Sequence, residues 1–146
     1  MEIITSHTNA DLDALASMVA AHKLYPSAMM ILPNKLSQSA EEFMSLHKDA
    51  FSFRSVRDIA FEDVTRIILV DTKSPRRINR LAELLLRPEV DVHIYDHHPW
   101  AEEDARGSLE IVETVGAAVT LLVEQDVYKR QEIRCKKKIM LFLPKG

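Results

Sequence analysis

Histidine and aspartate residues gather in three short stretches of this sequence. The stretches read "HTNADLDAL" (7–15), "LVDT" (69–72) and "YDHH" (95–98), and their ionisable members are His7, Asp11, Asp13, Asp71, Asp96, His97 and His98. Carboxylates that converge on one cleft repel one another unless a cation lies between them. Carboxylates and imidazoles without a thiolate suit Mn²⁺ or Mg²⁺ better than a structural zinc site. These residue types therefore predict a divalent-metal centre.

Each stretch taken alone has a simpler interpretation. An aspartate that follows a strand often caps the next helix, and this interpretation is favoured for Asp11 or Asp71 in isolation. The pair His97–His98 in isolation is typical of a solvated turn. The metal-centre hypothesis therefore depends on the fold bringing the three stretches together.

The elements that must position these residues can be predicted from the hydrophobic pattern. Apolar runs predict strands over residues 2–6, 28–33, 51–56, 65–72, 90–98 and 107–113. Apolar residues at helical spacing predict helices over 12–25, 37–50 and 76–86, and a final helix after Gly116. Strands that alternate with helices predict a mostly parallel sheet covered on both faces. This is a Rossmann-like three-layer α/β domain.

The predicted strand ends coincide with the polar stretches. His7, Asp71 and the Asp96–His98 run each lie where a predicted strand ends. In an open α/β sheet, ligands bind in the crevice outside the carboxyl ends of the strands. We therefore expect the three stretches to meet at one edge of the sheet.

Length and composition narrow the possible functions. The chain has 146 residues, enough for one domain with its own core. Its first 106 residues contain no glycine. This excludes a Walker-type loop or a GxGxxG turn there, because both need glycine for close approach to phosphate. No apolar run reaches the length of a membrane span and no signal-peptide pattern opens the chain, so we expect a cytoplasmic protein.

The charge distribution divides the chain into two parts. Residues 1–128 hold 12 basic and 21 acidic side chains, whereas residues 129–146 hold 7 basic and 1 acidic. We therefore expect a domain over residues 1–126 and a basic tail over 127–146. Such a tail can be a nucleic-acid arm. The favoured interpretation is that the tail interrupts the last helix and is no functional element.

In order and spacing, the three stretches resemble the first three motifs of the DHH phosphoesterase family. This family includes exonucleases, oligoribonucleases, cyclic-dinucleotide phosphodiesterases and manganese inorganic pyrophosphatases. The first stretch is most similar to the DHH domain that opens bacterial proteins of the poly(A) polymerase and tRNA nucleotidyltransferase type, which also carry CBS domains. The resemblance implies that two Mn²⁺ or Mg²⁺ ions support hydrolysis of phosphoester bonds in nucleotides or short single-stranded nucleic-acid ends.

The resemblance also implies a role for each residue. His7, Asp11 and Asp71 would hold one ion. Asp13, Asp71 and His97 would hold the second ion, so that Asp71 bridges the two. His98 would face the phosphate as a catalytic residue alongside Asp71. Asp96 would orient the histidines without binding an ion itself.

The sequence departs from the family pattern after the third motif. The family has a fourth motif with a further metal-binding aspartate, and a C-terminal domain that grips the substrate. Here the basic tail follows the last helix instead, and Asp126 comes too early to replace the missing aspartate. Two functions stay open: a metal-dependent phosphoesterase domain, or a non-catalytic metal- or nucleotide-binding fragment of a larger RNA-processing protein.

Two further features have weaker functional interpretations. Asp11-x-Asp13 suggests a haloacid dehalogenase-type phosphatase, but that family places its first aspartate directly at a strand end, and here the strand ends at His7. Arg76 and Arg77 open the helix predicted after Asp71 and could meet a phosphate. A solvated first turn is the favoured interpretation for both arginines.

Overall fold

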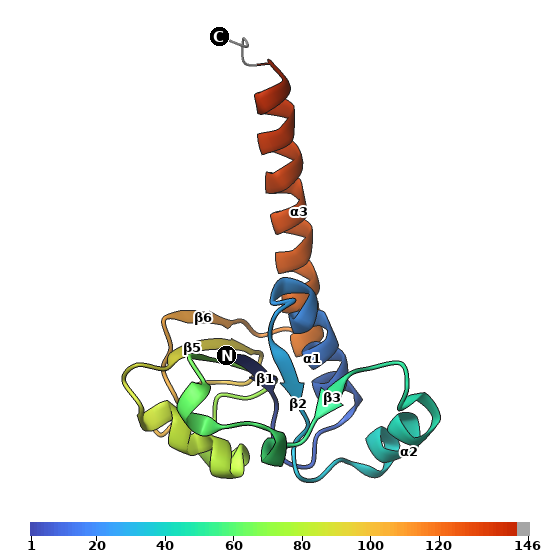
Figure 1. The fold of residues 1–146 in the computed structure, drawn as a ribbon, viewed down its shortest axis with the longest axis vertical. Coiled ribbons are helices and arrows are strands. Elements are labelled where there is room, and N and C mark those ends of the chain that lie inside the picture. Colours follow the sequence, from blue (N-terminus) through green and yellow to red (C-terminus); the bar gives the residue numbers. More distant parts are fainter. Residues whose placement is uncertain (143–146) are drawn as a thin grey trace.

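A single sheet of six parallel strands forms the centre of the molecule (Figure 1). The computed structural model describes the backbone of residues 1–142 and the side chains of residues 1–132. The strands are β1 (Glu2–Thr5), β2 (Met29–Ile31), β3 (Phe53–Arg54), β4 (Arg66–Val70), β5 (Asp91–Asp96) and β6 (Leu109–Val112). Their order across the sheet is β3-β2-β1-β4-β5-β6, and each pair of neighbours is parallel. The predicted α/β class is confirmed.

The sheet is buried on both faces, as its apolar strands require. Alternate residues of a strand point to opposite faces, and Ile3 and Ile67 pack in one core cluster while Ile4 and Ile68 pack in the other. All four side chains are fully buried. Near-continuous apolar runs such as that of β4 are typical of parallel strands covered on both sides.

Helices cover the two faces unequally. One face packs against α1 (Leu12–Leu24) and the start of α3 (Ala118–Phe142), which supply Met18, Ala21, Leu24 and Leu122 to its core. The other face is covered by short 3₁₀ segments: η1 (Val56–Asp58), η2 (Phe61–Asp63), η3 (Pro75–Arg77) and η4 (Asn79–Leu86). Helix α2 (Gln38–His47) lies near the β3 edge (Figure 1).

The helix predicted over residues 76–86 is wrong in type. The structure has two 3₁₀ segments there, η3 and η4, which are joined at Ile78, and η4 begins at Asn79. Asn79 has a φ of 51°, in the left-handed region, which interrupts a right-handed helix. Leu81 and Leu84 are buried, and their spacing of three residues matches one 3₁₀ turn.

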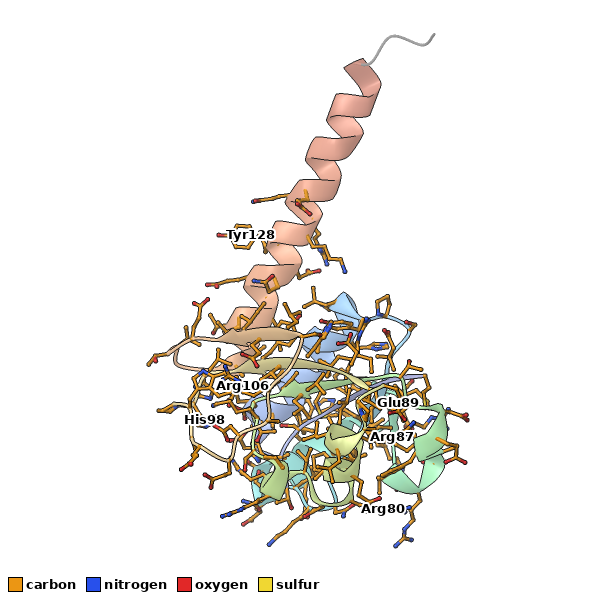
Figure 2. All side chains as sticks on the ribbon, turned by 90° about the vertical axis from the view of Figure 1, so that its left-hand side faces the viewer. Arg80, Arg87, Glu89, His98, Arg106 and Tyr128 are labelled. Carbon is orange, nitrogen blue, oxygen red and sulfur yellow. The ribbon has the colours of Figure 1, made fainter. Side chains whose placement is uncertain are left out.

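The basic tail does not interrupt the last helix, contrary to expectation. Helix α3 continues to Phe142 and projects well beyond the sheet (Figure 1). Arg130 pairs with Asp126 one turn earlier at 2.8 Å, and the Lys129 ammonium donates to the carbonyl of Leu24 at 3.2 Å. Tyr128 lies exposed on this projecting part (Figure 2). Residues 143–146 lie outside the described part of the chain. Among the described residues, no helix has the length and apolarity that a membrane span needs.

Gly107 allows the turn before β6 to lie close to strand β5. A methyl group at Gly107 would overlap the carbonyl oxygen of Val92, which accepts a hydrogen bond from the Ser108 amide at 2.9 Å. We expect Gly107→Ala to lower the free energy of unfolding by about 1–3 kcal/mol in urea denaturation. Gly116→Ala is the matched control, because a methyl group there meets no atom within 4 Å. Equal losses in both variants would contradict this explanation.

Candidate metal centre

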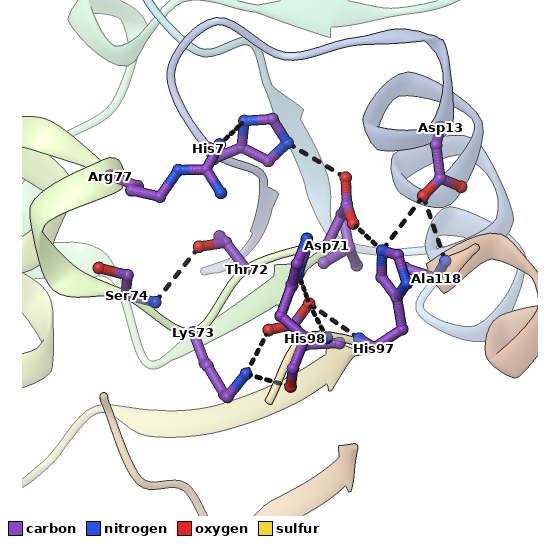
Figure 3. A network of polar contacts seen from close by, with 12 residues as sticks. His7, Asp13, Asp71, Thr72, Lys73, Ser74, Arg77, His97, His98 and Ala118 are labelled. Atoms are coloured by element: carbon purple, nitrogen blue, oxygen red, sulfur yellow. Dashed lines mark hydrogen bonds and ion pairs between the residues drawn. The ribbon is translucent and has the colours of Figure 1, made fainter. Parts of the chain in front are cut away.

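The carboxyl ends of β1, β4 and β5 bring the three polar stretches together. These strands are neighbours in the sheet, and the chain leaves each of them at the same edge. His7 follows β1, Asp71 follows β4, and Asp96 ends β5. The expectation that the three stretches meet is therefore confirmed (Figure 3).

Asp71 lies between two histidines. Its carboxylate oxygens lie 3.1 Å from Nε2 of His7 and 2.9 Å from Nε2 of His97. The Asp71 side chain is 4% exposed, and its backbone has a φ of 57°. Left-handed backbone outside glycine is uncommon and gathers at functional sites, although aspartate tolerates it better than most residues. The fold thus holds one buried carboxylate in contact with both imidazoles.

Backbone carbonyls orient the two histidines. Nδ1 of His97 lies 3.0 Å from the carbonyl oxygen of Val115, and Nδ1 of His7 lies 2.9 Å from that of Thr8. Burial lowers the pKa of each imidazole, but contacts with Asp71 and these carbonyls outweigh burial, so both pKa values lie above the usual range. A carbonyl that accepts the Nδ1 proton leaves Nε2 to bind a metal, an arrangement common around metal-bound histidines.

Asp11 fits both interpretations that the sequence suggested, as the cap of a helix and as a ligand of a metal ion. Its side chain caps α1 by accepting a hydrogen bond from the Ala14 amide at 2.9 Å. It also offers a carboxylate oxygen that lies within 4.8 Å of ligand atoms of His7 and Asp71. These three residues are the set that the family resemblance implied for the first ion.

Asp13 plays a structural part that the sequence did not suggest. Its two carboxylate oxygens accept hydrogen bonds from the amides of Ala118 and Val119, at 3.2 and 3.4 Å, and so cap the N-terminus of α3. Nε2 of His97 lies 3.8 Å from Asp13. Burial, followed by the nearby Asp71 charge, raises the pKa of Asp13. Asp13 therefore borders the centre while it anchors α3.

Asp96 is the centre of a second network, which connects Lys73, His97 and His98, three residues labelled in Figure 3. Its carboxylate accepts from the Lys73 ammonium at 2.7 Å, from Nδ1 of His98 at 2.6 Å and from the His97 amide at 2.8 Å. Burial raises the pKa of Asp96, but the contacts with Lys73 and His98 outweigh it and hold the pKa below its usual range. Asp96 thereby orients His98, whose side chain is 46% exposed at the molecular surface (Figure 2).

The donor atoms form two groups that suit divalent cations. His7, Asp11 and Asp71 make one group; Asp71, Asp96, His97 and His98 make the other, and Asp71 belongs to both. Asp13, which the resemblance placed with Asp71 and His97, lies 3.8 Å from Nε2 of His97 and also accepts hydrogen bonds from α3, so its place at a second ion stays a prediction. Oxygen and imidazole ligands without thiolate fit Mn²⁺ or Mg²⁺. The shared Asp71 fits a carboxylate that contacts two ions.

Sequence reasoning missed Lys73 and the contact of Arg77 with His7. The Lys73 side chain is 2% exposed, and its ammonium also donates to the His98 carbonyl at 2.7 Å. Arg77 is exposed, as expected, but its guanidinium also lies 2.9 Å from Nδ1 of His7, a contact that the sequence did not suggest. Arg76 is 80% exposed, as expected. The available signal was that both Lys73 and Arg77 follow Asp71 closely in the sequence.

The fold and the site together define a Rossmann-like domain with an acidic, histidine-rich centre at the carboxyl edge of its sheet. The family profile described as "DHH family, N-terminal domain" matches residues 2–143. The chain belongs to the DHH family, which confirms the resemblance found in the three motifs. The match continues past residue 126 into the basic tail.

Two curated relatives share this region. The A-adding tRNA nucleotidyltransferase of Geobacter sulfurreducens is 39% identical over 144 residues, which cover 98% of this chain and 16% of the relative. The protein of the same name from Aquifex aeolicus is 34% identical over 126 residues, or 85% of this chain and 14% of the relative. The chain thus spans about one sixth of the length of these relatives. They are of the tRNA nucleotidyltransferase type that the first motif resembled.

Solved structures confirm the fold. An exopolyphosphatase-related protein from Bacteroides fragilis superposes with a TM-score of 0.66 at 19% identity, over 87% of this chain and 40% of that protein. A putative family II inorganic pyrophosphatase from Methanococcus jannaschii gives a TM-score of 0.62 at 21% identity, over 92% and 41%. At this level of identity, the likeness shows the fold alone.

Proposed function

We propose that this chain carries the metal centre of a phosphoesterase that hydrolyses phosphoester bonds in nucleotides or short single-stranded nucleic-acid ends. The observation that carries the proposal is the buried Asp71 carboxylate in contact with Nε2 of both His7 and His97. Divalent cations held at such a site activate water and offset the charge of a phosphoryl group. Membership of the DHH family supports this chemistry.

The proposal assigns a separate role to each residue of the centre. His7, Asp11 and Asp71 would hold one Mn²⁺ or Mg²⁺ ion, and Asp71 and His97 would contribute to a second. Because Nδ1 of His98 donates its proton to the Asp96 carboxylate, the Nε2 atom of this exposed ring is left to face a phosphate oxygen, and it would donate to that oxygen in the doubly protonated form of the ring. Lys73 and Asp96 would position His98 rather than touch the substrate.

A second candidate function is a non-catalytic metal- or nucleotide-binding module within a larger RNA-processing protein. The position of Asp13 favours it. Both Asp13 oxygens accept hydrogen bonds from α3 amides, so a second ion would have to share this carboxylate with the start of that helix. The curated relatives, named as A-adding tRNA nucleotidyltransferases, supply the RNA-processing context.

Metal-dependent stability tests the proposed centre. Mn²⁺ at a hundredfold excess over its dissociation constant is expected to stabilise the fold by about 2.7 kcal/mol. For a domain of this size, the melting temperature should rise by about 5–10 °C. Asp71→Asn should remove most of this rise, because Asp71 belongs to both ligand groups. Asp13→Asn should remove less, and thermal melts in Mn²⁺ and in chelator measure the difference.

The comparison is made within each variant, because Asp71→Asn also changes the metal-free protein. Asp49→Asn is the control, since Asp49 is an exposed carboxylate outside both ligand groups. Its Mn²⁺-induced rise should equal that of the unmodified protein. A melting temperature that does not respond to Mn²⁺ in the unmodified protein would rule out the proposed centre.

A further inference from the structure

One cationic side chain, that of Arg77, lies against the proposed metal centre. Three cations follow Asp71 closely in the sequence: Lys73, Arg76 and Arg77. Lys73 is buried and holds Asp96 and the His98 carbonyl. The guanidinium of Arg76 faces Glu103 at 3.6 Å. The guanidinium of Arg77 instead lies against a ligand of the proposed metal centre.

The backbone fixes Arg77 beside the loop that follows β1. The Thr8 amide donates to the Arg77 carbonyl at 2.7 Å, which ties η3 to this loop. The Arg77 guanidinium lies 2.9 Å from Nδ1 of His7, and Nε2 of the same ring lies 3.1 Å from Asp71 (Figure 3). One imidazole ring therefore separates the guanidinium from the central carboxylate.

The contacts of His7 cannot all be satisfied by one arrangement of protons. Guanidinium groups only donate and backbone carbonyls only accept. Nδ1 of His7 therefore needs a lone pair for Arg77 but a proton for the Thr8 carbonyl, which lies equally close at 2.9 Å. A cation on Nε2 requires the proton on Nδ1, which selects the Thr8 carbonyl as partner. Binding of the cation would then displace the Arg77 guanidinium from His7.

We propose that Arg77 is a phosphate-binding residue of this centre, held against His7 in the metal-free protein and released toward the substrate phosphate when a cation binds. This inference rests on the proposed function and names the ligand chemistry: a terminal phosphate, as in a nucleoside monophosphate. The guanidinium matches two phosphate oxygens with paired donors. Its exposed position leaves it free to turn.

Two binding measurements test this inference with adenosine monophosphate as the probe. Arg77→Met should weaken binding of the probe to the Mn²⁺-loaded protein about tenfold or more, as expected for loss of a charge-assisted contact. The same variant should bind Mn²⁺ more tightly than the unmodified protein, because the guanidinium no longer competes for His7. Isothermal titration calorimetry measures both affinities, and Arg77→Lys should recover part of the probe affinity.

Arg76→Met is the matched control, since it removes the same charge one residue away without touching His7. Unchanged probe affinity in Arg76→Met together with the loss in Arg77→Met would support the inference. Equal losses in the two variants would overturn it in favour of general electrostatic attraction. Probe binding that survives in Arg77→Met would overturn it while leaving the metal centre intact. If the unmodified protein binds no Mn²⁺, the proposed function fails, and this inference fails with it.

Discussion

Replacement of Lys73 by methionine is expected to lower the free energy of unfolding of the metal-free protein by about 3–5 kcal/mol. Lys73 and Asp96 form a buried ion pair at 2.7 Å, with side chains 2% and 1% exposed. Methionine fills a similar volume but leaves the Asp96 carboxylate charged and without its cation. Removal of one partner from a buried pair is costly because the other charge stays desolvated. Urea denaturation in the presence of a chelator measures this loss.

The pH dependence separates this electrostatic cause from a packing defect. In the unmodified protein the pKa of Asp96 lies below its usual range, so its contribution to stability is present above the pKa of the unfolded chain and is lost as pH falls through the folded pKa. In Lys73→Met, burial would instead raise the pKa of Asp96. The carboxylate would then take up a proton in the folded variant as pH falls, so its deficit should be smaller at pH 5 than at pH 8.

Arg76→Met is the control for this experiment as well. Arg76 makes an exposed ion pair with Glu103, and such pairs contribute about 0–1 kcal/mol. Its stability should therefore stay close to that of the unmodified protein at both pH values. A deficit in Lys73→Met that does not change with pH would show that lost packing, rather than the unpaired Asp96 charge, is responsible.

The meeting of His7, Asp71 and His97 could be predicted because it depends on strand periodicity alone. Each residue follows an apolar run, and parallel strands bring their carboxyl ends to one edge. The contacts of Lys73 depend instead on a loop that folds back over it. The Ala105 amide donates to the Lys73 carbonyl at 2.8 Å, and Asp104 lies 3.8 Å from its ammonium. Nothing in the local pattern around Lys73 indicates its contacts with Asp104 and Ala105, which lie much later in the sequence.

The remaining errors have local physical causes. An apolar pattern over residues 76–86 does not distinguish an α-helix from 3₁₀ turns, and the left-handed Asn79 decides between them. In the basic tail, lysine, arginine, glutamate and glutamine are all good helix formers. The change in charge that suggested an interruption therefore did not end α3. Asp13 was expected only at the metal, because its spacing within the first motif carries no information about α3.

We expect any hydrolysis by this chain to be slow, because neither the second ion nor the substrate would be fully held in place. With Mn²⁺, we expect the 146-residue chain to cleave a short oligoribonucleotide at least about 100-fold more slowly than the full-length Geobacter sulfurreducens relative, of which the matched region covers 16%. Asp13 is held by α3 amides. The family resemblance implies a further metal-binding aspartate and a second domain for alignment, and misplacement by about 1 Å already costs about 10²-fold in rate.

The measurement is the release of mononucleotides under identical Mn²⁺ concentrations, with Asp71→Asn in this chain and the aligned aspartate replaced in the relative. Mn²⁺ binding without turnover by the short chain, together with aspartate-dependent turnover by the relative, would assign the centre to a phosphoesterase that needs the longer protein. Rapid, Asp71-dependent turnover by the short chain would show that the contacts of Asp13 with α3 do not prevent catalysis. It would also overturn the proposal of a non-catalytic binding module. An inactive relative that still binds Mn²⁺ would overturn the phosphoesterase proposal, because the same buried Asp71 would then hold a metal without performing hydrolysis.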